Sequence, residues 1–399
     1  MGENGLGRKE FVRIDGEPVF YLMHKDMIVC QMVLSEDRKP RKIVFNEDAA
    51  DHIPLGAGMN LTRFHEWWED RAVPRTRQGA KKALRRLGYA NTGDMLIDNL
   101  ALSLTDCYWI KPVGSDITWA DVNLYTNPFE DYFGAITIDQ DADIGKRSRF
   151  SLATSQGEVR KKWVIRSDGT RAMVKGNWGE SYQQSINEVF ASKIHESQGM
   201  MPYTEYNLVP LEMKNHLPGL GCISDLFTSE QVEFVSAWEV MCSAKKKTDY
   251  SYFQHFKKQC MDHGMDEEYF DRFQSYEILT DFLMSNTDRH MNNIGIIRDP
   301  DTLSWIGFAP IYDTGNAMFF NDRDLNWISV NEIKVTSFLS TEDKLLRYVT
   351  HPDIVDLSKL PSKDEFYELY EKEIPERHGR IDKLWELFMK KADMVAAMQ

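Results

Sequence analysis

The segment of the chain that decides the fold reads Ser285-Asn286-Thr287-Asp288-Arg289-His290-Met291-Asn292-Asn293. Residues 276–283 precede it and carry apolar side chains at the spacing of one helix face. A predicted β-hairpin follows it, with strands at 294–297 and 304–308. The pattern therefore predicts a polar loop between a helix and a hairpin.

Three side chains in and after this loop have the chemistry that phosphoryl transfer needs. Asp288 precedes Asn293 within the loop, and Asp313 follows the hairpin. In such a transfer one carboxylate orients and deprotonates the attacking hydroxyl, while an amide oxygen and a second carboxylate hold Mg²⁺ against the ATP phosphates. Because Mg²⁺ keeps water and phosphate oxygens for most of its ligands, two protein residues suffice. A short hairpin brings ligands on its two sides together.

His290, in the same loop, has two open roles. Histidine is the side chain that most often acts as a general base. Neutral histidines that hold a loop through hydrogen bonds are commoner, and that role is the one we favour.

A lysine and a glutamate in the preceding part of the chain complete the predicted site. Lys175 ends the strand 172–175, where its ammonium would reach the phosphates of ATP. Glu188, on the helix that follows, would orient this lysine through an ion pair. Glu188 also completes the capping-box pattern Ser185-x-x-Glu188, so its two roles remain open.

A stretch of small residues, 151–157, joins two predicted strands and is suited to a backbone cradle for phosphates. Its candidate phosphate-binding residues are Ser151, Thr154, Ser155 and Gly157. A cradle would bring the three hydroxyls close to the γ-phosphate, so they are also candidate sites of self-phosphorylation. The alternative is that they are ordinary turn hydroxyls that bond to the local backbone.

The order of predicted elements divides the chain into three parts. Up to residue 143, strands such as the hairpin 20–34 alternate with short helices, and 109–133 is predicted to be loop-like. Residues 144–227 read as strand, strand, helix, strand, strand, and residues 228–399 as mostly helical. A β-rich unit followed by a helical unit predicts an α+β fold with a ligand cleft between two lobes.

Composition narrows the class of protein further. The 399 residues carry a net charge of −14 and are 42% hydrophobic, which favours a folded core and disfavours non-specific nucleic-acid binding. The five cysteines form no C-x-x-C pair, which argues against a disulfide framework and a zinc site. Neither a membrane-spanning stretch nor a signal peptide is apparent, so we expect a cytoplasmic protein that does not bind membranes.

The loop Asn286-Thr287-Asp288-Arg289-His290-x-x-Asn293, with Tyr312-Asp313, resembles that of the HipA-like serine/threonine kinases. These belong to the wider protein-kinase-like fold, which also includes phosphatidylinositol kinases with a similar loop. The resemblance implies a bilobal fold with a β-rich N-lobe, a helical C-lobe and an extra N-terminal α/β segment of HipA-like type.

The resemblance also implies roles for individual residues. Asp288 would be the catalytic base, in a loop whose Arg289 and His290 also belong to the catalytic set. Asn293 and Asp313 would bind Mg²⁺, and Lys175 would contact ATP. A hinge at 222–227 would hold the adenine.

The segment after the predicted phosphate loop departs from the toxin members of the family. Those have Gln-x-x-Lys, whereas this chain reads Gln156-Gly157-Glu158-Val159-Arg160. The departure puts toxin activity in doubt, and it leaves a helix-turn-helix antitoxin-type partner as an expectation without support from the sequence. Self-phosphorylation of the phosphate loop is a further expectation from the resemblance.

Together these features predict a kinase that uses ATP and Mg²⁺ to phosphorylate Ser or Thr in a protein. A lipid or small-molecule phosphotransferase would use the same loop, and a basic, membrane-facing patch near the cleft would favour it. A nucleotide-binding regulatory module with little turnover is the third reading, and the presence of the base and both metal positions argues against it. The sequence does not name the acceptor or the oligomeric state.

Overall fold

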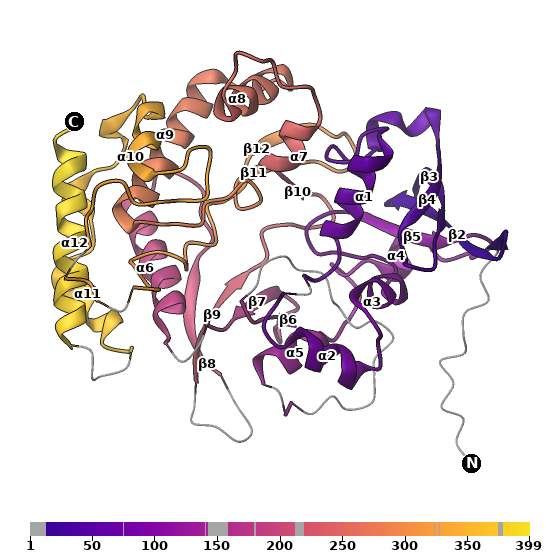
Figure 1. Ribbon diagram of the computed structural model, residues 1–399, viewed down its shortest axis with the longest axis horizontal. Coiled ribbons are helices and arrows are strands. Elements are labelled where there is room, and N and C mark those ends of the chain that lie inside the picture. The colour runs from indigo at the N-terminus through magenta and orange to yellow at the C-terminus, as the bar shows by residue number, and fades with distance from the viewer. Residues whose placement is uncertain are drawn as a thin grey trace.

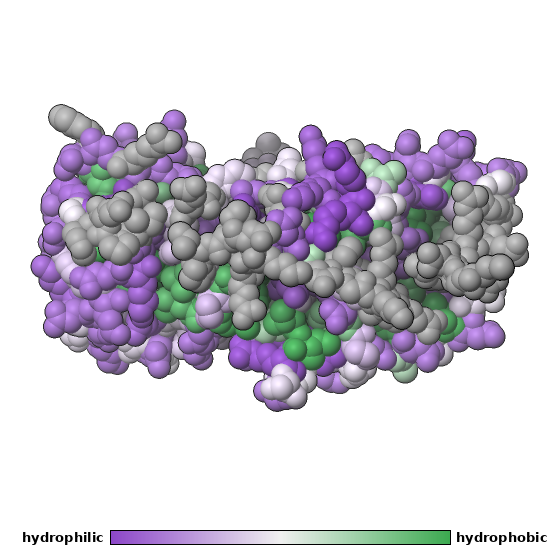
Figure 2. All heavy atoms as spheres, turned by 90° about the horizontal axis from the view of Figure 1, so that it is seen from below, coloured by the Kyte–Doolittle hydropathy of each residue, from purple (hydrophilic) through white to green (hydrophobic). Residues whose placement is uncertain are grey.

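The computed structural model describes residues 13–74, 76–139, 141–142, 159–178, 181–211, 219–322, 324–326, 328–373 and 378–399. Figure 1 shows the C-terminal helices at one end of the molecule and the N-terminal strands at the other. In the view of Figure 2, hydrophilic side chains predominate toward the left end, and apolar patches appear along the middle and toward the right.

The N-terminal part is built on an antiparallel sheet with helices around it. Its strands are β1 (Arg13–Ile14), β2 (Glu17–His24), β3 (Met27–Leu34), β4 (Pro40–Phe45) and β5 (Tyr108–Pro112). Its helices are η1 (Glu47–His52), α1 (Leu61–Asp70), α2 (Ala80–Leu87), α3 (Thr92–Asp98), α4 (Trp119–Val122) and α5 (Tyr132–Ile138). The predicted hairpin 20–34 is confirmed as β2 and β3, which pair in an antiparallel register.

The prediction that 109–133 is loop-like was wrong at 109–112, which belong to β5, and at 119–122, which form α4, whereas 113–118 and 123–131 contain neither a helix nor a named strand. β5 pairs with β2 along its whole length, from Phe20 opposite Pro112 to His24 opposite Tyr108. Trp109 and Ile110 are fully buried in the core of this part. The Pro and Gly residues after Pro112 suggested a loop, and a strand whose partner lies so far away in sequence leaves no local signal.

The central part has the predicted order of strand, strand, helix, strand, strand. Its elements are β6 (Lys161–Ile165), β7 (Arg171–Lys175), α6 (Gln183–Gln198), β8 (Tyr206–Leu211) and β9 (Gly219–Asp225). They form an antiparallel sheet in the order β6-β7-β9-β8. Gly169 takes a φ of 90° in the turn between β6 and β7, a conformation that glycine adopts without steric penalty.

The C-terminal part is mainly helical around a small sheet. Its strands are β10 (Glu233–Ser236), β11 (Gly295–Arg298) and β12 (Trp305–Phe308). Its helices are α7 (Ala237–Cys242), α8 (Tyr252–Asp262), α9 (Glu267–Met284), α10 (Glu342–Leu345), η2 (Leu346–Tyr348), η3 (Pro352–Ile354), η4 (Leu357–Lys359), α11 (Lys363–Tyr370) and α12 (His378–Ala396). The sequence prediction missed β10, which pairs with the distant β11.

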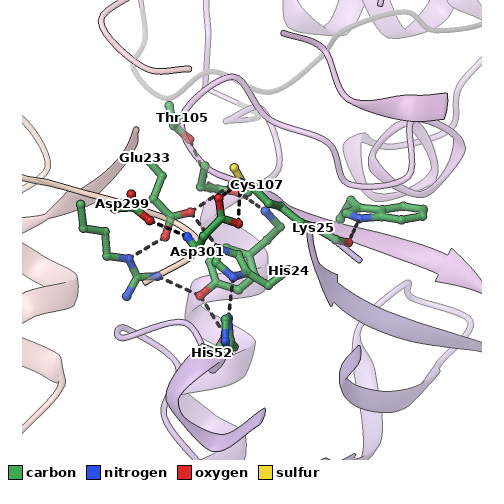
Figure 3. A network of polar contacts seen from close by, with 12 residues as sticks. His24, Lys25, His52, Thr105, Cys107, Glu233, Asp299 and Asp301 are labelled. Carbon is green, nitrogen blue, oxygen red and sulfur yellow. Dashed lines mark hydrogen bonds and ion pairs between the residues drawn. The ribbon is translucent and has the colours of Figure 1, made fainter. Parts of the chain in front are cut away.

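A buried polar network joins the N-terminal part to β10 and β11 (Figure 3). Glu233 Oε1 accepts from Arg298 Nε at 2.5 Å, and Glu233 Oε2 lies 3.0 Å from His24 Nε2. Arg298 also donates to the Tyr108 hydroxyl at 3.0 Å. Burial alone would raise the pKa of Glu233, but Arg298 and His24 hold it below its usual range. The network fixes the N-terminal sheet against β10 and against β11, the strand that follows the predicted catalytic loop.

In the described part of the chain, three antiparallel sheets with helices packed around them confirm the α+β class. Within the described ranges, every helix is too short or too polar to cross a membrane.

Candidate active site

A cavity of about 780 Å³ lies between the β6–β9 sheet and the loops that follow α9 and β12. The N-terminal part closes one of its sides with residues from α1, α3 and the turn after β3. Four residues predicted from the sequence line it: Lys175, His290, Asn293 and Asp313. Residues 224–228, which overlap the predicted hinge at 222–227, also line the cavity.

Lys175 is held at the end of β7 by three acceptors. Its ammonium donates to Glu188 Oε1 at 2.8 Å, to Asp313 Oδ1 at 2.8 Å and to the Tyr206 hydroxyl at 3.0 Å. An ammonium has three N–H donors, so all of them are engaged. Burial opposes the charged form, but Asp313 and Glu188 raise the pKa of Lys175 well above its ordinary value. The contact of Lys175 with the phosphates of ATP stays a prediction.

Glu188 joins α6 to the segment that carries Asp313. Its second oxygen, Oε2, accepts from the backbone N–H of Thr314 at 2.9 Å. The alternative capping-box role is wrong, because α6 begins at Gln183 and Ser185 lies inside the helix. The buried carboxylate therefore holds both the lysine and the backbone next to Asp313.

Arg289 is buried behind the cavity and holds two loops together. Its Nε and Nη2 donate to both carboxylate oxygens of Asp281, at 2.8 and 3.0 Å. It also donates to the carbonyl oxygens of Tyr312 and Asn293 and to the Thr314 hydroxyl. Burial would lower its pKa, but Asp281 raises it. Since it does not line the cavity, Arg289 is a positioning residue.

Asp288 is half-buried beside the cavity-lining residues. Asn293 Nδ2 donates to its backbone oxygen at 3.0 Å, and Asn316 Nδ2 donates to its carboxylate at 2.7 Å. Gln184 donates to the oxygen of Asn316 at 2.6 Å, which turns the amino group of Asn316 toward Asp288. Burial raises the pKa of Asp288, which makes the carboxylate a stronger base. The sequence analysis missed Asn316 and Gln184, which no local pattern distinguishes.

His290 lines the cavity and bonds within its own loop. The backbone N–H of Asn292 donates to His290 Nδ1 at 3.2 Å. This is the kind of contact expected of a histidine that holds a loop. The other ring nitrogen, Nε2, takes no part in this hydrogen bond.

Asn293 and Asp313 have the donor atoms that Mg²⁺ takes. Because Asn293 gives its amino group to Asp288, its amide oxygen is left as a ligand. Burial would raise the pKa of Asp313, but Lys175 and Lys161 hold it low, so the carboxylate is ionised. Among the described residues there is no cluster of three or more His, Cys, Asp or Glu that could hold a metal. An amide and one carboxylate fit Mg²⁺, which takes its remaining ligands from water and phosphate.

The hinge side of the cavity has an aromatic floor. Phe227 lies 5.4 Å from Tyr312 and 5.9 Å from Phe234, measured between ring centroids. Aromatic surfaces of this kind accept the face of a nucleotide base. The predicted phosphate-loop residues Ser151, Thr154, Ser155 and Gly157 lie outside the described residues.

The sequence analysis also missed Lys161, a buried lysine of β6 that lines the cavity. It stands directly opposite Lys175 in the β6–β7 register. The alternation of side chains along β6 places Lys161 and Trp163 on one face, and this pattern was available in the sequence.

No family model matches the chain, and no curated protein matches it either. A solved structure, described as a Helicobacter pylori proinflammatory kinase CtkA, is similar over 61% of this chain and 90% of that chain. Its sequence identity is 16% and its TM-score is 0.44. A similarity of this size does not identify the family of the chain.

Proposed function

We propose that this protein is a kinase that uses ATP and Mg²⁺ to phosphorylate Ser or Thr in a protein. We further propose a bilobal protein-kinase-like fold of the HipA-like type, with an N-terminal unit over 1–143 and lobes over 144–227 and 228–399. The observation that carries the proposal is the meeting of Lys175, Glu188 and Asp313 beside Asn293 and Asp288.

The geometry supports a distinct role for each side chain in the transfer. The acceptor oxygen attacks the γ-phosphorus while the bond from that phosphorus to the β,γ-bridging oxygen breaks, and the acceptor proton passes to Asp288. Asn316 holds the Asp288 carboxylate by a bond of 2.7 Å, so the base is oriented before the acceptor arrives.

Asn293 and Asp313 would hold Mg²⁺, which supplies positive charge against the phosphate oxygens. Lys175 and Glu188 fix the position of Asp313 from the sheet side, and Arg289 fixes the backbone of Tyr312 next to it. These buried contacts make the constellation rigid, which lowers the reorganisation that the transfer requires.

The proposal is tested by incubating the purified full-length protein with labelled ATP and Mg²⁺. The acceptors are the protein itself, casein, and vesicles that contain phosphatidylinositol. Label on Ser or Thr of a protein supports the proposal, while label on lipid alone supports the lipid-kinase alternative. Asp116→Asn is a matched control, because Asp116 is exposed in the loop before α4. If wild type labels no acceptor and hydrolyses no ATP, the proposal is wrong.

A further inference from the structure

Two lysines stand side by side in the sheet that covers the cavity. Lys161 on β6 and Lys175 on β7 are direct partners in the antiparallel register. Opposite residues of such a pair point to the same face of the sheet, and both line the cavity. Their ammonium groups therefore enter the same space from neighbouring strands.

The two lysines differ in their partners. Lys175 donates its three N–H groups to Glu188, Asp313 and Tyr206. Lys161 is only 8% exposed. Over the part of the chain that the structure describes, it has neither a hydrogen bond nor an ion pair.

A buried ammonium without a contacting partner is costly, because the more distant charge of Asp313 offsets only part of the desolvation. Burial accordingly lowers the pKa of Lys161 to about 7, against the attraction of Asp313. An anion that enters the cavity would offset this cost by giving Lys161 a partner. Lys175 already has two carboxylates as partners, so its charge is balanced before any ligand arrives.

The cavity is polarised along the sheet. Ala172 faces Asp225 at the hinge end of β7, and Lys175 faces Cys222 further along the strand. Three residues of strand at roughly 3.3 Å each put the lysine pair about 10 Å from Asp225, which lies within the predicted hinge.

Another side of the cavity carries carboxylates from α1 together with Arg38, Lys39 and Arg71, each of which is already paired with a carboxylate. The lining residues from the end of α1 include the carboxylates of Glu66, Glu69 and Asp70. An anionic group is therefore favoured at the lysine end, while the aromatic floor beside the hinge suits a base.

We propose that Lys161 is the direct cationic contact for the phosphate chain of a nucleoside di- or triphosphate, and that Lys175 acts as a positioning residue for Asp313. This inference rests on the proposed function and refines it, since the sequence alone assigned the phosphate contact to Lys175. The ligand chemistry is that of a polyphosphate ester. Inorganic tripolyphosphate shares the anion without the base.

The test compares Lys161→Met with Lys162→Met and Lys161→Arg. Lys162 is the adjacent residue of β6 and points to the opposite face, so it is a matched control. Calorimetry with Mg²⁺ present measures the Kd of ATP, adenosine and inorganic tripolyphosphate for each variant. Thermal unfolding without ligand measures the effect of each change on the fold.

We expect Lys161→Met to weaken ATP and tripolyphosphate by about tenfold to a hundredfold, as the loss of one charged hydrogen bond does. Adenosine affinity should stay within twofold, and the unfolding temperature of the ligand-free variant should equal or exceed that of wild type. Lys161→Arg should retain most of the affinity, and Lys162→Met should match wild type throughout.

Failure of this inference is distinguishable from failure of the proposed function. If wild type binds ATP and Lys161→Met binds it equally well, the inference is wrong and the proposed function stands. Equal losses for ATP and adenosine, or a lower unfolding temperature of ligand-free Lys161→Met, would give Lys161 a structural role and also overturn the inference. If wild type binds tripolyphosphate through Lys161 but not ATP, the anion site stands and the kinase proposal fails. If wild type binds neither, both are wrong.

Discussion

Replacing Arg289 with methionine tests whether one buried guanidinium holds the catalytic loop against the segment that carries Asp313. Arg289 bonds both oxygens of Asp281, on helix α9, at 2.8 and 3.0 Å. It also bonds the backbone oxygen of Tyr312 and the hydroxyl of Thr314. Methionine retains the apolar stem, but it leaves Asp281 in the interior without its charge partner.

The size of the effect follows from the burial of the pair. Removing one partner of a buried ion pair costs about 3–5 kcal/mol, because the other charge is left uncompensated. The side chains of Arg289 and Asp281 are only 4% and 12% exposed, so solvent offers little screening. The lost bonds to Tyr312 and Thr314 favour the upper part of this range. We therefore expect the free energy of unfolding to fall by about 3–5 kcal/mol.

Urea unfolding, followed by tryptophan fluorescence, measures this change. Arg272→Met is the matched control: Arg272 lies on the same helix as Asp281, has no ion pair within the described ranges, and should change stability by less than about 0.5 kcal/mol. The double variant Arg289→Met with Asp281→Asn should lose less free energy of unfolding than the two single variants lose together, by about 0.5–3 kcal/mol. Additive single effects, or a loss below about 1 kcal/mol for Arg289→Met, would refute the reasoning.

Three further predictions concern the residues around this core. Asn316→Ala removes the bond that orients the Asp288 carboxylate, so we expect kcat, measured by steady-state kinetics, to fall about tenfold. ATP affinity, measured by calorimetry, should change little, and an unchanged kcat would contradict the role of Asn316. Glu188→Gln keeps an acceptor for the Thr314 N–H but removes a charge partner of Lys175, so the rate of phosphate transfer should fall about tenfold or more in a transfer assay. Transfer at the wild-type rate would show that the ion pair is dispensable. Burial lowers the pKa of His195 to about 3, whereas the unfolded chain has the ordinary value of 6.5, so the unfolded state binds more protons between these values and stability is lost as pH falls from 6.5 toward 3. His195→Gln should therefore cost about 1 kcal/mol at pH 7.5, for the bond to Tyr276, and less relative to wild type at pH 5; thermal unfolding at the two pH values would measure this, and an equal difference at both would contradict it.

Much of the fold was predictable because its signals are local. The turn at Gly169 and the apolar alternation beside it fix the β6–β7 hairpin without help from distant residues. The capping box at Ser362 and Glu365 opens α11, and both of its bonds form within one helical turn. Such features depend on residues a few positions apart, which the sequence shows directly.

The missed features depend on contacts between distant residues. β5 and β10 are strands because β2 and β11 pair with them, and neither has a strong local pattern. The Ser185-x-x-Glu188 pattern misled for the same reason, since the start of α6 at Gln183 decides whether it can act as a cap. Propensity and spacing are overridden wherever tertiary pairing supplies the stabilisation.

The candidate site shows the same division. Asp288, Asn293 and Asp313 were singled out because their residue types and order along the chain match one chemistry. Lys161 and Asn316 were missed, because their importance comes from the register of two strands and from a hydrogen bond across the fold. Sequence order does not show which of two lysines lacks a partner.

The most direct test of the proposed kinase is the rate of phosphate transfer by Asp288→Asn compared with wild type. Single-turnover transfer from labelled ATP, at saturating Mg²⁺, measures the chemical step, and calorimetry measures ATP affinity in parallel. The amide has the shape of the carboxylate but cannot take up the proton of the attacking hydroxyl. We therefore predict that the transfer rate falls by about a hundredfold or more, while ATP affinity stays within twofold of wild type. Transfer by Asp288→Asn at the wild-type rate would contradict the assignment of Asp288 as the base and, with it, the proposed mechanism.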